Sequence, residues 1–309
     1  MTQRFEQLIA GRKPRDRSAQ DHYAAGVTDT FDMLLFGATG PVGRALRARA
    51  ALAGLKLALV SRHRHVDSDT ERWFRHDLYH EGGETLPAVR VVLSAGPLDG
   101  ITRWSEREPQ PAGTRIVALS STSALVKQAS PDPRERDLAR TLLDCEQRML
   151  ALGEVRSCPV TLLRPTLIYG NGPDRSLSRL VGVCRRIGGV PLPASALGIR
   201  QPVHADDLAA ALLACADRAE LAGAVLTLPG AERLSYRDMV QRQLDVSTPG
   251  RRVWSISDGL FRAAVGVLSR VPGPLRTLAT LVRRMSQDLA FDDSDWRKLG
   301  ISPRRFEPE

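Results

Sequence analysis

Short runs of apolar residues alternate along this chain with longer, more mixed stretches. The runs at 31–36, 55–61, 89–96, 114–121 and 159–164 are predicted to be strands. They are apolar throughout rather than at every second position, so we expect strands that are buried on both faces of a parallel sheet. The intervening stretches, which include 41–53 and 132–152, are predicted to be helices. Strand–helix alternation of this kind predicts a doubly wound α/β fold of the Rossmann type.

The composition of the sequence changes after the last of these strands, where Gly and Pro become frequent. Short helices are predicted between the Gly- and Pro-rich stretches, at 205–217 and 235–243. We therefore expect a basic, loose N-terminal arm at 1–30 and a Rossmann domain at 31–165. A smaller, mixed substrate-binding lobe is expected at 166–309, with some segments returning to the sheet.

Charge and hydropathy limit the possible partners. The 309 residues carry a net charge of +9, almost all of the cations are arginine, and such a field attracts anions. Aromatic residues are few, so a nucleic-acid partner is not expected. No apolar run approaches the roughly 20 residues of a membrane span, and the N-terminus lacks the apolar stretch of a signal peptide, which predicts a cytoplasmic protein.

The segment 256–285 combines apolar faces with arginines and is broken at Pro272 and Pro274. A basic amphipathic segment of this kind could lie on a membrane surface. The sequence favours the alternative, a helix pair that covers the lobe or makes a dimer contact. A homodimer is therefore a possible assembly.

Neither cysteines nor histidines predict a metal site. The four cysteines lack the spacing of a zinc site or a redox pair and are expected to be buried and reduced. His63 with His65, and His76 with His80, are paired by spacing, but no third ligand lies nearby in the sequence.

A glycine motif follows the first predicted strand and opens the first predicted helix. Gly37, Gly40 and Gly43 form a G-x-x-G-x-x-G pattern. Gly37 would allow the sharp turn, Gly40 would let a pyrophosphate approach the backbone, and Gly43 would let the helix pack closely on the strand. The free N–H groups and positive dipole end of the helix would then face the phosphates. The pattern predicts a dinucleotide site, in which Thr39, Pro41 and Val42 complete the loop.

The end of the second predicted strand indicates which dinucleotide is bound. An acidic residue there would bind the adenosine ribose of NAD, but this chain has Ser61, Arg62 and Arg64. The Arg62 guanidinium suits a 2′-phosphate, so NADP is preferred over NAD. The alternative is that Arg62 is solvated and the site takes NAD without an acid.

Several motifs together resemble the extended short-chain dehydrogenase/reductase superfamily, in particular its NAD-dependent epimerase/dehydratase group. The motifs are FGATGPVG, RHDLYH, LSAGP, VALSSTSA, LLRPTLIYGNG, GIRQPVHADDLAAA and the tail DLAFDDSDWRKLGISPRRFEP. The resemblance implies further cofactor-binding positions at Asp77, Leu78, Ser94, Ala95, Gly96, Ser120 and Pro165. It also implies substrate binding by Thr122, Asn171 and Arg200, with Arg200 on a substrate diphosphate.

One departure from this family concerns proton transfer. The family uses a Tyr-x-x-x-Lys pair on the helix after the Ser/Thr strand, whose spacing puts both side chains on one helix face. When that helix is aligned on Glu146, the two positions hold Leu138 and Leu142. No tyrosine lies between Tyr79 and Tyr169, so no shift of the alignment restores the pair.

Two functions follow from these observations. The first is an enzyme, an NAD(P)-dependent oxidoreductase or sugar-nucleotide epimerase/dehydratase with a non-standard acid–base group. The second is a catalytically inactive nucleotide-binding scaffold or sensor, similar to an accessory subunit of respiratory complex I. The candidate catalytic residues are Thr122, Ser121 and Tyr169. A relocated base at Lys127, Asp144 or Tyr169 is conceivable.

Overall fold

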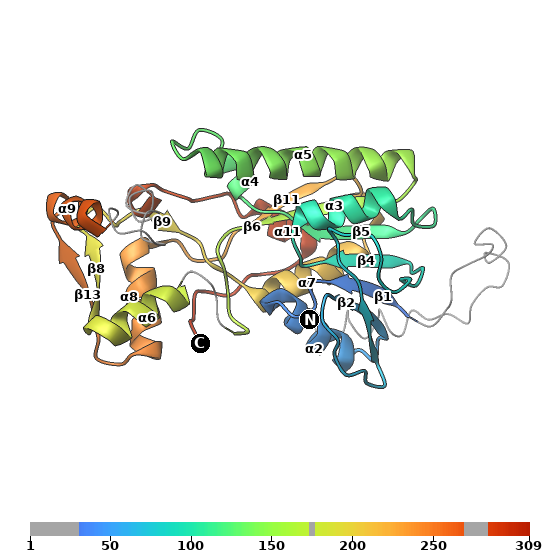
Figure 1. Cartoon of the computed structure of the whole chain (residues 1–309), viewed down its shortest axis with the longest axis horizontal. Helices are drawn as coiled ribbons and strands as arrows, with labels where there is room; N and C mark the ends of the chain where they lie inside the picture. The colour runs from blue at the N-terminus through green and yellow to red at the C-terminus, as the bar shows by residue number, and fades with distance from the viewer. Residues whose placement is uncertain (1–30, 173–176, 269–283) are drawn as a thin grey trace. The chain divides into compact units, whose positions relative to one another are not determined.

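The computed structural model describes residues 31–172, 177–268 and 284–309 (Figure 1). The predicted N-terminal arm lies outside these residues. The chain divides into two compact units. Of the described residues, those within 31–120, 141–163 and 209–226 form the first unit, and those within 121–140, 164–208 and 227–309 form the second. The chain passes between the two units several times, and 209–226 is a segment after residue 165 that belongs to the unit with the sheet.

The first unit is built on a seven-stranded sheet whose strand order is β11-β6-β5-β4-β1-β2-β3. The neighbouring strands from β6 to β3 are parallel. The chain crosses over between β1 and β4, which are neighbours in the sheet although they are not consecutive. The strands are β1 (Met33–Phe36), β2 (Leu57–Ser61), β3 (Glu71–Arg75), β4 (Val91–Ser94), β5 (Arg115–Leu119), β6 (Val160–Pro165) and β11 (Val225–Leu228).

Helices cover both faces of this sheet, which confirms the predicted fold class. Leu34 and Phe36 of β1 share a core with Trp104 and Met149, whereas Leu35 is buried on the other face. The continuous apolar runs thus reflect strands that are buried on both sides. The helices are α2 (Pro41–Leu52), α3 (Leu98–Arg107), α5 (Pro133–Val155) and α7 (Ala205–Ala216), together with a 3-10 turn at Ala219–Leu221.

The second unit consists of helices and three two-stranded sheets around a core of its own. The strand pairs are β7 (Ile168–Tyr169) with β10 (Val203–His204), β9 (Ile199–Arg200) with β12 (Leu234–Ser235), and β8 (Gly189–Pro193) with β13 (Arg252–Ile256). The helices are α4 (Ser123–Val126), α6 (Leu177–Ile187), α8 (Tyr236–Ser247), α9 (Asp258–Leu268) and α11 (Ser294–Leu299). The helix pair predicted at 256–285 is described only in part, because 269–283 lies outside the described residues. Among the described helices, none combines the length and the apolar character needed to cross a bilayer.

The C-terminal tail packs into the core of the second unit. Phe306 is buried there, with its ring 4.7 Å from that of Tyr169. Glu232 pairs with Arg242 at 2.8 Å and with Arg305 at 3.3 Å, and it also accepts a hydrogen bond from the Phe306 amide. One carboxylate therefore joins α8 to the tail.

We expect Glu232→Gln to lower the free energy of unfolding at pH 7 by about 1–2 kcal/mol, because two guanidinium groups lose their anionic partner. The hydrogen bond from Arg242, followed by that from Arg305, lowers the pKa of Glu232 below its usual 4.5. Since the folded-state pKa is depressed, this stabilisation is present above about pH 4.5 and is lost as the pH falls through the folded-state value. Urea unfolding at pH 7 and at pH 3 measures the difference, with Glu220→Gln as an exposed control. An equal gap between wild type and Glu232→Gln at both pH values would contradict the assignment.

Candidate functional site

The glycine loop lies at the crossover between β1 and β4. Gly37 follows β1 directly and has a φ of +74°, which a residue with a Cβ rarely adopts. A Cβ at Gly37 would lie 2.5 Å from the amide nitrogen of Gly96 and 2.6 Å from the carbonyl carbon of Ala95. The turn after β1 and the turn after β4 are therefore in backbone contact, and only glycine fits between them.

The other two glycines of the motif have different surroundings. A Cβ at Gly43 would lie 2.2 Å from the carbonyl oxygen of Gly37, so α2 packs directly onto the loop. A Cβ at Gly40 would meet only that same oxygen, at 3.4 Å. Gly43 is required by packing within the protein, whereas the space above Gly40 is open. A phosphate group could approach the backbone there.

The N-terminus of α2 lacks a negatively charged side chain of its own. Gly40 is its N-cap, no side chain caps the helix, and its first turn contains no acidic residue. The first hydrogen bond into the helix runs from the Arg44 amide to the Gly40 carbonyl at 2.9 Å. The Arg44 guanidinium donates to the Thr39 carbonyl, which places an additional cation at the loop that the sequence analysis did not identify. This helix end has the properties of a phosphate site.

The end of β2 carries the predicted NADP determinant. Arg62 is exposed and has no hydrogen bond or ion pair to another described residue. The Ser61 hydroxyl accepts from the His63 amide and contacts His65 Nε2 at 3.0 Å. His65 stacks on Trp73 at 4.0 Å between ring centroids. The Arg62 guanidinium is thus available to a ligand.

Asp77 and Leu78 follow β3 and are held by local contacts. The Asp77 carboxylate accepts from the Tyr79 amide at 3.0 Å and contacts His80 at 3.1 Å. The Tyr79 hydrogen bond is the main reason that the pKa of Asp77 lies below its usual value. Leu78 packs against Gly100 at the edge of the sheet core.

The predicted cofactor residues at the ends of β4 and β5 are buried or half-buried. Ser94 is fully buried and its hydroxyl has no partner in the described structure. The Ser120 hydroxyl, at the end of β5, donates to the Glu146 carboxylate at 2.5 Å. Glu146 is itself buried, so a carboxylate on α5 fixes the end of the strand. In the sequence analysis Glu146 served only to align its helix, and its contact with Ser120 was not predicted.

In the second unit, Thr122 and Ser121 have partners that restrict their chemistry. Thr122 is buried, and both its amide and its hydroxyl donate to the Pro165 carbonyl, at 3.0 and 3.1 Å. The Ser121 hydroxyl accepts from the Ser123 amide. The Thr122 oxygen can still accept a hydrogen bond, but among the described residues its proton is donated to a carbonyl and not to a base.

Tyr169 and Asn171 belong to a network that holds the C-terminal tail. The Tyr169 hydroxyl donates to the Arg305 carbonyl at 2.8 Å and accepts from the Glu307 amide at 3.3 Å, and burial raises its pKa. The Asn171 side chain donates to Asp206, and its amide donates to Glu309. Both predicted site residues are thus occupied by contacts within the second unit.

Arg200 is buried, with 7% of its surface exposed, and it forms no ion pair with a described residue. Its guanidinium donates to the carbonyls of Ile199, Gln287 and Arg284 and lies 5.3 Å from the centre of the Tyr236 ring. Burial lowers its pKa. Three of its donors are committed to backbone carbonyls, so binding a substrate diphosphate would require these bonds to be exchanged.

The helix face that carries the proton-transfer pair in the resembled family is apolar here. Leu138 is 43% exposed, and Leu142 packs against the sheet core. Of the conceivable replacements, Asp144 is exposed and pairs with Arg148 at 2.9 Å. Tyr169 is occupied as described above.

Lys127, at the C-terminus of α4, differs from the other two candidates. It is half-buried, and its amino group has no hydrogen-bond or ion-pair partner among the described residues. Burial, reinforced by the nearby Arg284, lowers its pKa from 10.5 to about 8, although Asp132 acts in the opposite direction. A lysine with this pKa can hold or release a proton near neutral pH.

The described residues contain no cluster of three side chains that could hold a metal ion. His76 pairs with Glu108 at 3.2 Å and His80 with Asp77. The four cysteines are buried and unpaired, as expected.

Comparison with curated proteins finds a distant relative in sequence. No family model matches the chain. UDP-glucose 4-epimerase from Vibrio cholerae is 26% identical over 172 residues, which cover 55% of this chain and 49% of the relative. The chain thus aligns with about half the length of this curated relative.

Solved structures match over most of the chain. MoeE5 in complex with UDP-glucose and NAD superposes with a TM-score of 0.62 at 20% identity, covering 89% of this chain and 94% of that chain. Epimerase Mth375 from Methanothermobacter thermautotrophicus gives 0.63 at 14% identity, with coverages of 94% and 92%. dTDP-glucose 4,6-dehydratase from Bacillus anthracis, in complex with NAD, gives 0.61 at 12% identity, with coverages of 89% and 92%.

The chain therefore has the fold of the extended short-chain dehydrogenases/reductases. More particularly, its fold is that of the sugar-nucleotide epimerases and dehydratases, as the sequence motifs predicted.

Proposed function

We propose that this protein binds a nicotinamide dinucleotide at the glycine loop and acts on a nucleotide sugar. The observation that carries the proposal is the contrast between two glycines of the loop. Gly43 is enclosed by backbone, whereas Gly40 faces open space beside a helix N-terminus that has no capping group and no acid. A phosphate-bearing ligand supplies what this helix end lacks.

The test is a titration of the purified protein with NADPH and with NADH, followed by nicotinamide fluorescence. Binding of either dinucleotide with micromolar affinity supports the proposal. Oxidation of the bound dinucleotide is then followed against a panel of sugar nucleotides and small carbonyl compounds. If neither dinucleotide binds, the loop is only a tight turn and the proposed function is wrong.

The preferred dinucleotide in this proposal is NADP. MoeE5 and the Bacillus anthracis dehydratase hold NAD, so the preference rests on Arg62 alone. Arg62 is exposed at the end of β2 and forms no hydrogen bond with a described residue, although its charge acts on the Asp77 carboxylate. No acidic residue occupies the end of β2 itself. A guanidinium there suits a 2′-phosphate better than a ribose hydroxyl.

We expect Arg62→Glu to weaken NADPH binding about 10- to 100-fold and to leave NADH binding within a few-fold of wild type, because only NADPH loses a charge-assisted pair. Fluorescence titration of both dinucleotides measures the split. Arg72→Glu, on the neighbouring strand β3, makes the same change in charge and serves as the control. An equal loss for NADPH and NADH would overturn the NADP assignment.

The substrate class follows from the fold relatives and from the charge of the chain. The related structures are complexes or enzymes of nucleotide sugars. A net charge of +9 favours anionic substrates of this class. Thr122, Asn171 and Arg200 remain the proposed substrate contacts, and Arg200 would have to exchange a backbone carbonyl for the diphosphate.

The proton-transfer group in this proposal is Lys127. A bound nicotinamide would supply hydride transfer, and a protein group must then accept or return the substrate proton. Tyr169 is occupied and Asp144 is solvated in an ion pair. The Lys127 amino group is unpartnered among the described residues, and its pKa is about 8. Lys127 belongs to the same compact unit as Thr122, five residues further along the chain.

The alternative function is a nucleotide-binding scaffold without catalysis. The exposed Leu138, which occupies the position of the family tyrosine, favours it. Tight dinucleotide binding with no turnover on the whole substrate panel would support this alternative over the enzyme.

A further inference from the structure

The turn that follows β7 has a backbone conformation that other parts of the second unit must hold in place. Gly170, Asn171 and Gly172 have φ values of +84°, +58° and +114°. Asparagine adopts a left-handed conformation more readily than most residues, but still at a cost. The two flanking glycines can take many other conformations. Contacts from outside the turn must therefore select the one that is observed.

His204 forms one wall of this turn. It lies on β10, which pairs with β7 so that His204 is opposite Tyr169. His204 is 2% exposed, and a Cβ at Gly170 would lie 2.2 Å from its Nε2 atom. The imidazole thus rests directly on the backbone of the turn.

The hydrogen bonds of His204 determine which ring nitrogen carries the proton. Nδ1 accepts from the Asp206 amide at 3.1 Å, so the proton of the neutral imidazole is on Nε2. Nε2 then donates to the Oε1 atom of Glu309 at 3.0 Å. The buried ring therefore directs its N–H group at the C-terminal tail.

The second carboxylate oxygen of Glu309 binds the turn itself. Oε2 accepts from the Asn171 amide at 3.1 Å, and the Asn171 side chain donates to Asp206 at 2.8 Å. One carboxylate is thus bound by two donors, one from β10 and one from the turn after β7. The hydrogen bond from His204, followed by that from Asn171, lowers the pKa of Glu309 below its usual 4.5. The group is therefore ionised at neutral pH.

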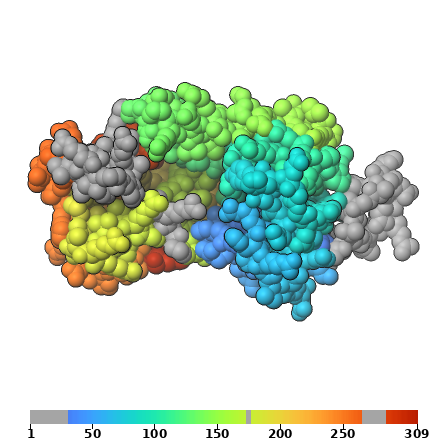
Figure 2. Space-filling model, viewed as in Figure 1, coloured from blue at the N-terminus to red at the C-terminus, as the bar shows by residue number. Residues whose placement is uncertain are grey.

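Other residues anchor the tail before Glu309 reaches the turn. The Arg304 side chain pairs with Asp207 at 3.1 Å and lies 3.6 Å from Asp206, and the Arg304 amide also donates to Asp207. Figure 2 shows C-terminal atoms (red) at the molecular surface, and the Glu309 side chain is 57% exposed. Removal of this side chain should therefore leave the rest of the tail in place.

We infer that Glu309 is a positioning residue, which holds Asn171 in the conformation in which it contacts the nucleotide sugar. The inference rests on the proposed function, in which Asn171 is a substrate contact. His204 acts through Glu309, because its N–H group fixes the orientation of the carboxylate. Glu309 was not a candidate in the sequence analysis, since its two partners lie 105 and 138 residues away along the chain.

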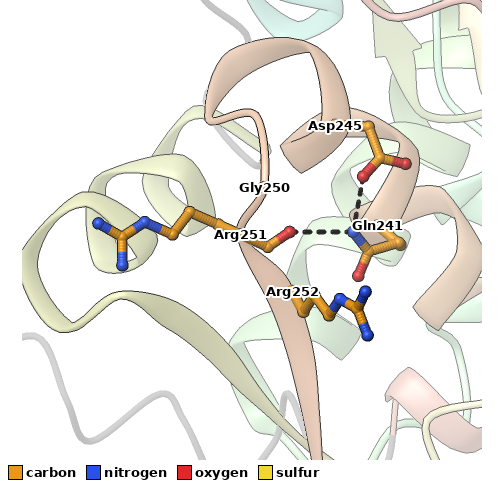
Figure 3. A pocket seen from close by; sticks show the side chains of 5 residues that line it. All are labelled: Gln241, Asp245, Gly250, Arg251 and Arg252. Atoms are coloured by element: carbon orange, nitrogen blue, oxygen red, sulfur yellow. Dashed lines mark hydrogen bonds between the residues drawn. The ribbon is translucent and has the colours of Figure 1, made fainter.

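The arginines that line a pocket of the second unit do not offer an equivalent pair of donors. The pocket is lined by Gln241, Asp245, Gly250, Arg251 and Arg252. Figure 3 shows the Arg251 and Arg252 side chains pointing away from each other, and the Gln241 side chain bonded to Asp245 and to the Arg251 carbonyl. Diverging guanidinium groups do not bind both oxygens of one carboxylate. Once Glu309 is removed, a small carboxylate is therefore expected at His204 and Asn171 rather than in this pocket.

Hydrogen exchange tests the contact in the protein alone. In Glu309→Ala the Asn171 amide should exchange about 10-fold faster than in wild type, because it loses a charge-assisted hydrogen bond to a partly exposed group. Acetate, which supplies the atoms that this substitution removes, should slow the exchange again in Glu309→Ala and leave the wild type unchanged. Sodium chloride at the same ionic strength should have no such effect.

The matched control is a second glutamate of the same tail. Glu307 is exposed, and its side chain makes no hydrogen bond with a described residue, although its amide donates to Tyr169. Glu307→Ala therefore makes the same change in charge without removing a contact of the turn. Its Asn171 amide should exchange at the wild-type rate, with or without acetate.

Substrate binding tests the positioning role. The probe is UDP-glucose, which is the ligand of the MoeE5 structure. Glu309→Ala should weaken UDP-glucose binding about 10-fold, and acetate should restore most of the loss. NADPH affinity should stay at the wild-type value, because the glycine loop belongs to the other unit. In turnover, the effect should be on KM, with kcat within a few-fold of wild type.

Three results would overturn the inference. The first is a wild-type exchange rate of the Asn171 amide in Glu309→Ala. The second is an equal effect of Glu307→Ala and Glu309→Ala, which would mean that the charge of the tail acts without a specific contact. The third is wild-type UDP-glucose affinity in Glu309→Ala despite faster exchange.

Failure of the proposed function gives a different pattern. A wild-type protein that binds NADPH but no nucleotide sugar would refute the proposed substrate class, and the positioning role would fall with it. A wild-type protein that binds no dinucleotide would refute the dinucleotide site, whereas hydrogen exchange would still decide whether Glu309 holds the turn. Unfolding curves for each variant separate loss of the contact from loss of the fold.

Discussion

Replacing Gly40 with valine should reduce dinucleotide affinity by at least about 100-fold while the fold remains intact. The added side chain would meet only the Gly37 carbonyl oxygen, at 3.4 Å, and would otherwise extend into the open space above the loop. That space is where the pyrophosphate must approach the backbone. The N-cap change itself should lower the free energy of unfolding by only about 1 kcal/mol.

Two further glycine variants make this result specific. Gly43→Ala places a Cβ 2.2 Å from the Gly37 oxygen and 2.7 Å from the Ala38 Cα, so it should lose stability as well as binding. Gly182→Ala, in α6, meets nothing within 4 Å, so it should leave binding unchanged and raise the free energy of unfolding by up to about 1 kcal/mol. Thermal unfolding and NADPH titration of all three variants give the comparison. A Gly40→Val protein that still binds NADPH with wild-type affinity would falsify the phosphate assignment.

The second large effect is expected at Lys127. If the protein turns over a substrate, Lys127→Met should lower kcat by roughly 10²- to 10⁴-fold, the usual contribution of a general acid or base. In the direction that oxidises a substrate hydroxyl, the wild-type rate should rise with pH through about 8, because the lysine must be neutral to accept the proton. The variant should lack this limb of the pH profile.

The pH dependence of the free energy of unfolding tests the state of Lys127 without requiring turnover. The folded-state pKa of Lys127 lies below its unfolded value of 10.5, so between about pH 8 and 10.5 the unfolded chain binds one proton more. The free energy of unfolding of the wild type should therefore rise with pH in this window relative to Lys127→Met. Lys56→Met removes an exposed lysine and serves as the control. A variant with full activity and a normal pH profile would place proton transfer elsewhere.

Most of the sheet could be predicted from the sequence because its strands are apolar on both faces. The predicted strands at 31–36, 55–61 and 114–121 contain β1, β2 and β5. β3 was missed, since Glu71, Arg72 and Arg75 interrupt its apolar residues. It lies at the edge of the sheet, where one side needs no apolar cover and charged residues are tolerated.

The candidate site was only partly predictable. The glycine loop could be found because its residues are close together in the sequence and its backbone requirements are strict. Most partners of Arg200 and Tyr169 could not, because they lie 84 to 138 residues away along the chain. Nothing in the local sequence shows whether a polar side chain is free for a ligand or occupied by a distant backbone group.

The sequence by itself determined the fold class and the position of the glycine loop, and it predicted the departure from the Tyr-x-x-x-Lys pattern. Each depends on residue type at short spacing, where hydrophobic period and backbone sterics act locally. Only the tertiary structure decided that Gly40 is open while Gly43 is enclosed, and that Lys127 is half-buried without a described partner. It likewise placed the Arg251 guanidinium against Gly188 and the Trp254 ring against Gly189. These features arise from contacts between distant segments, and burial and charge at such contacts set the chemistry of each side chain.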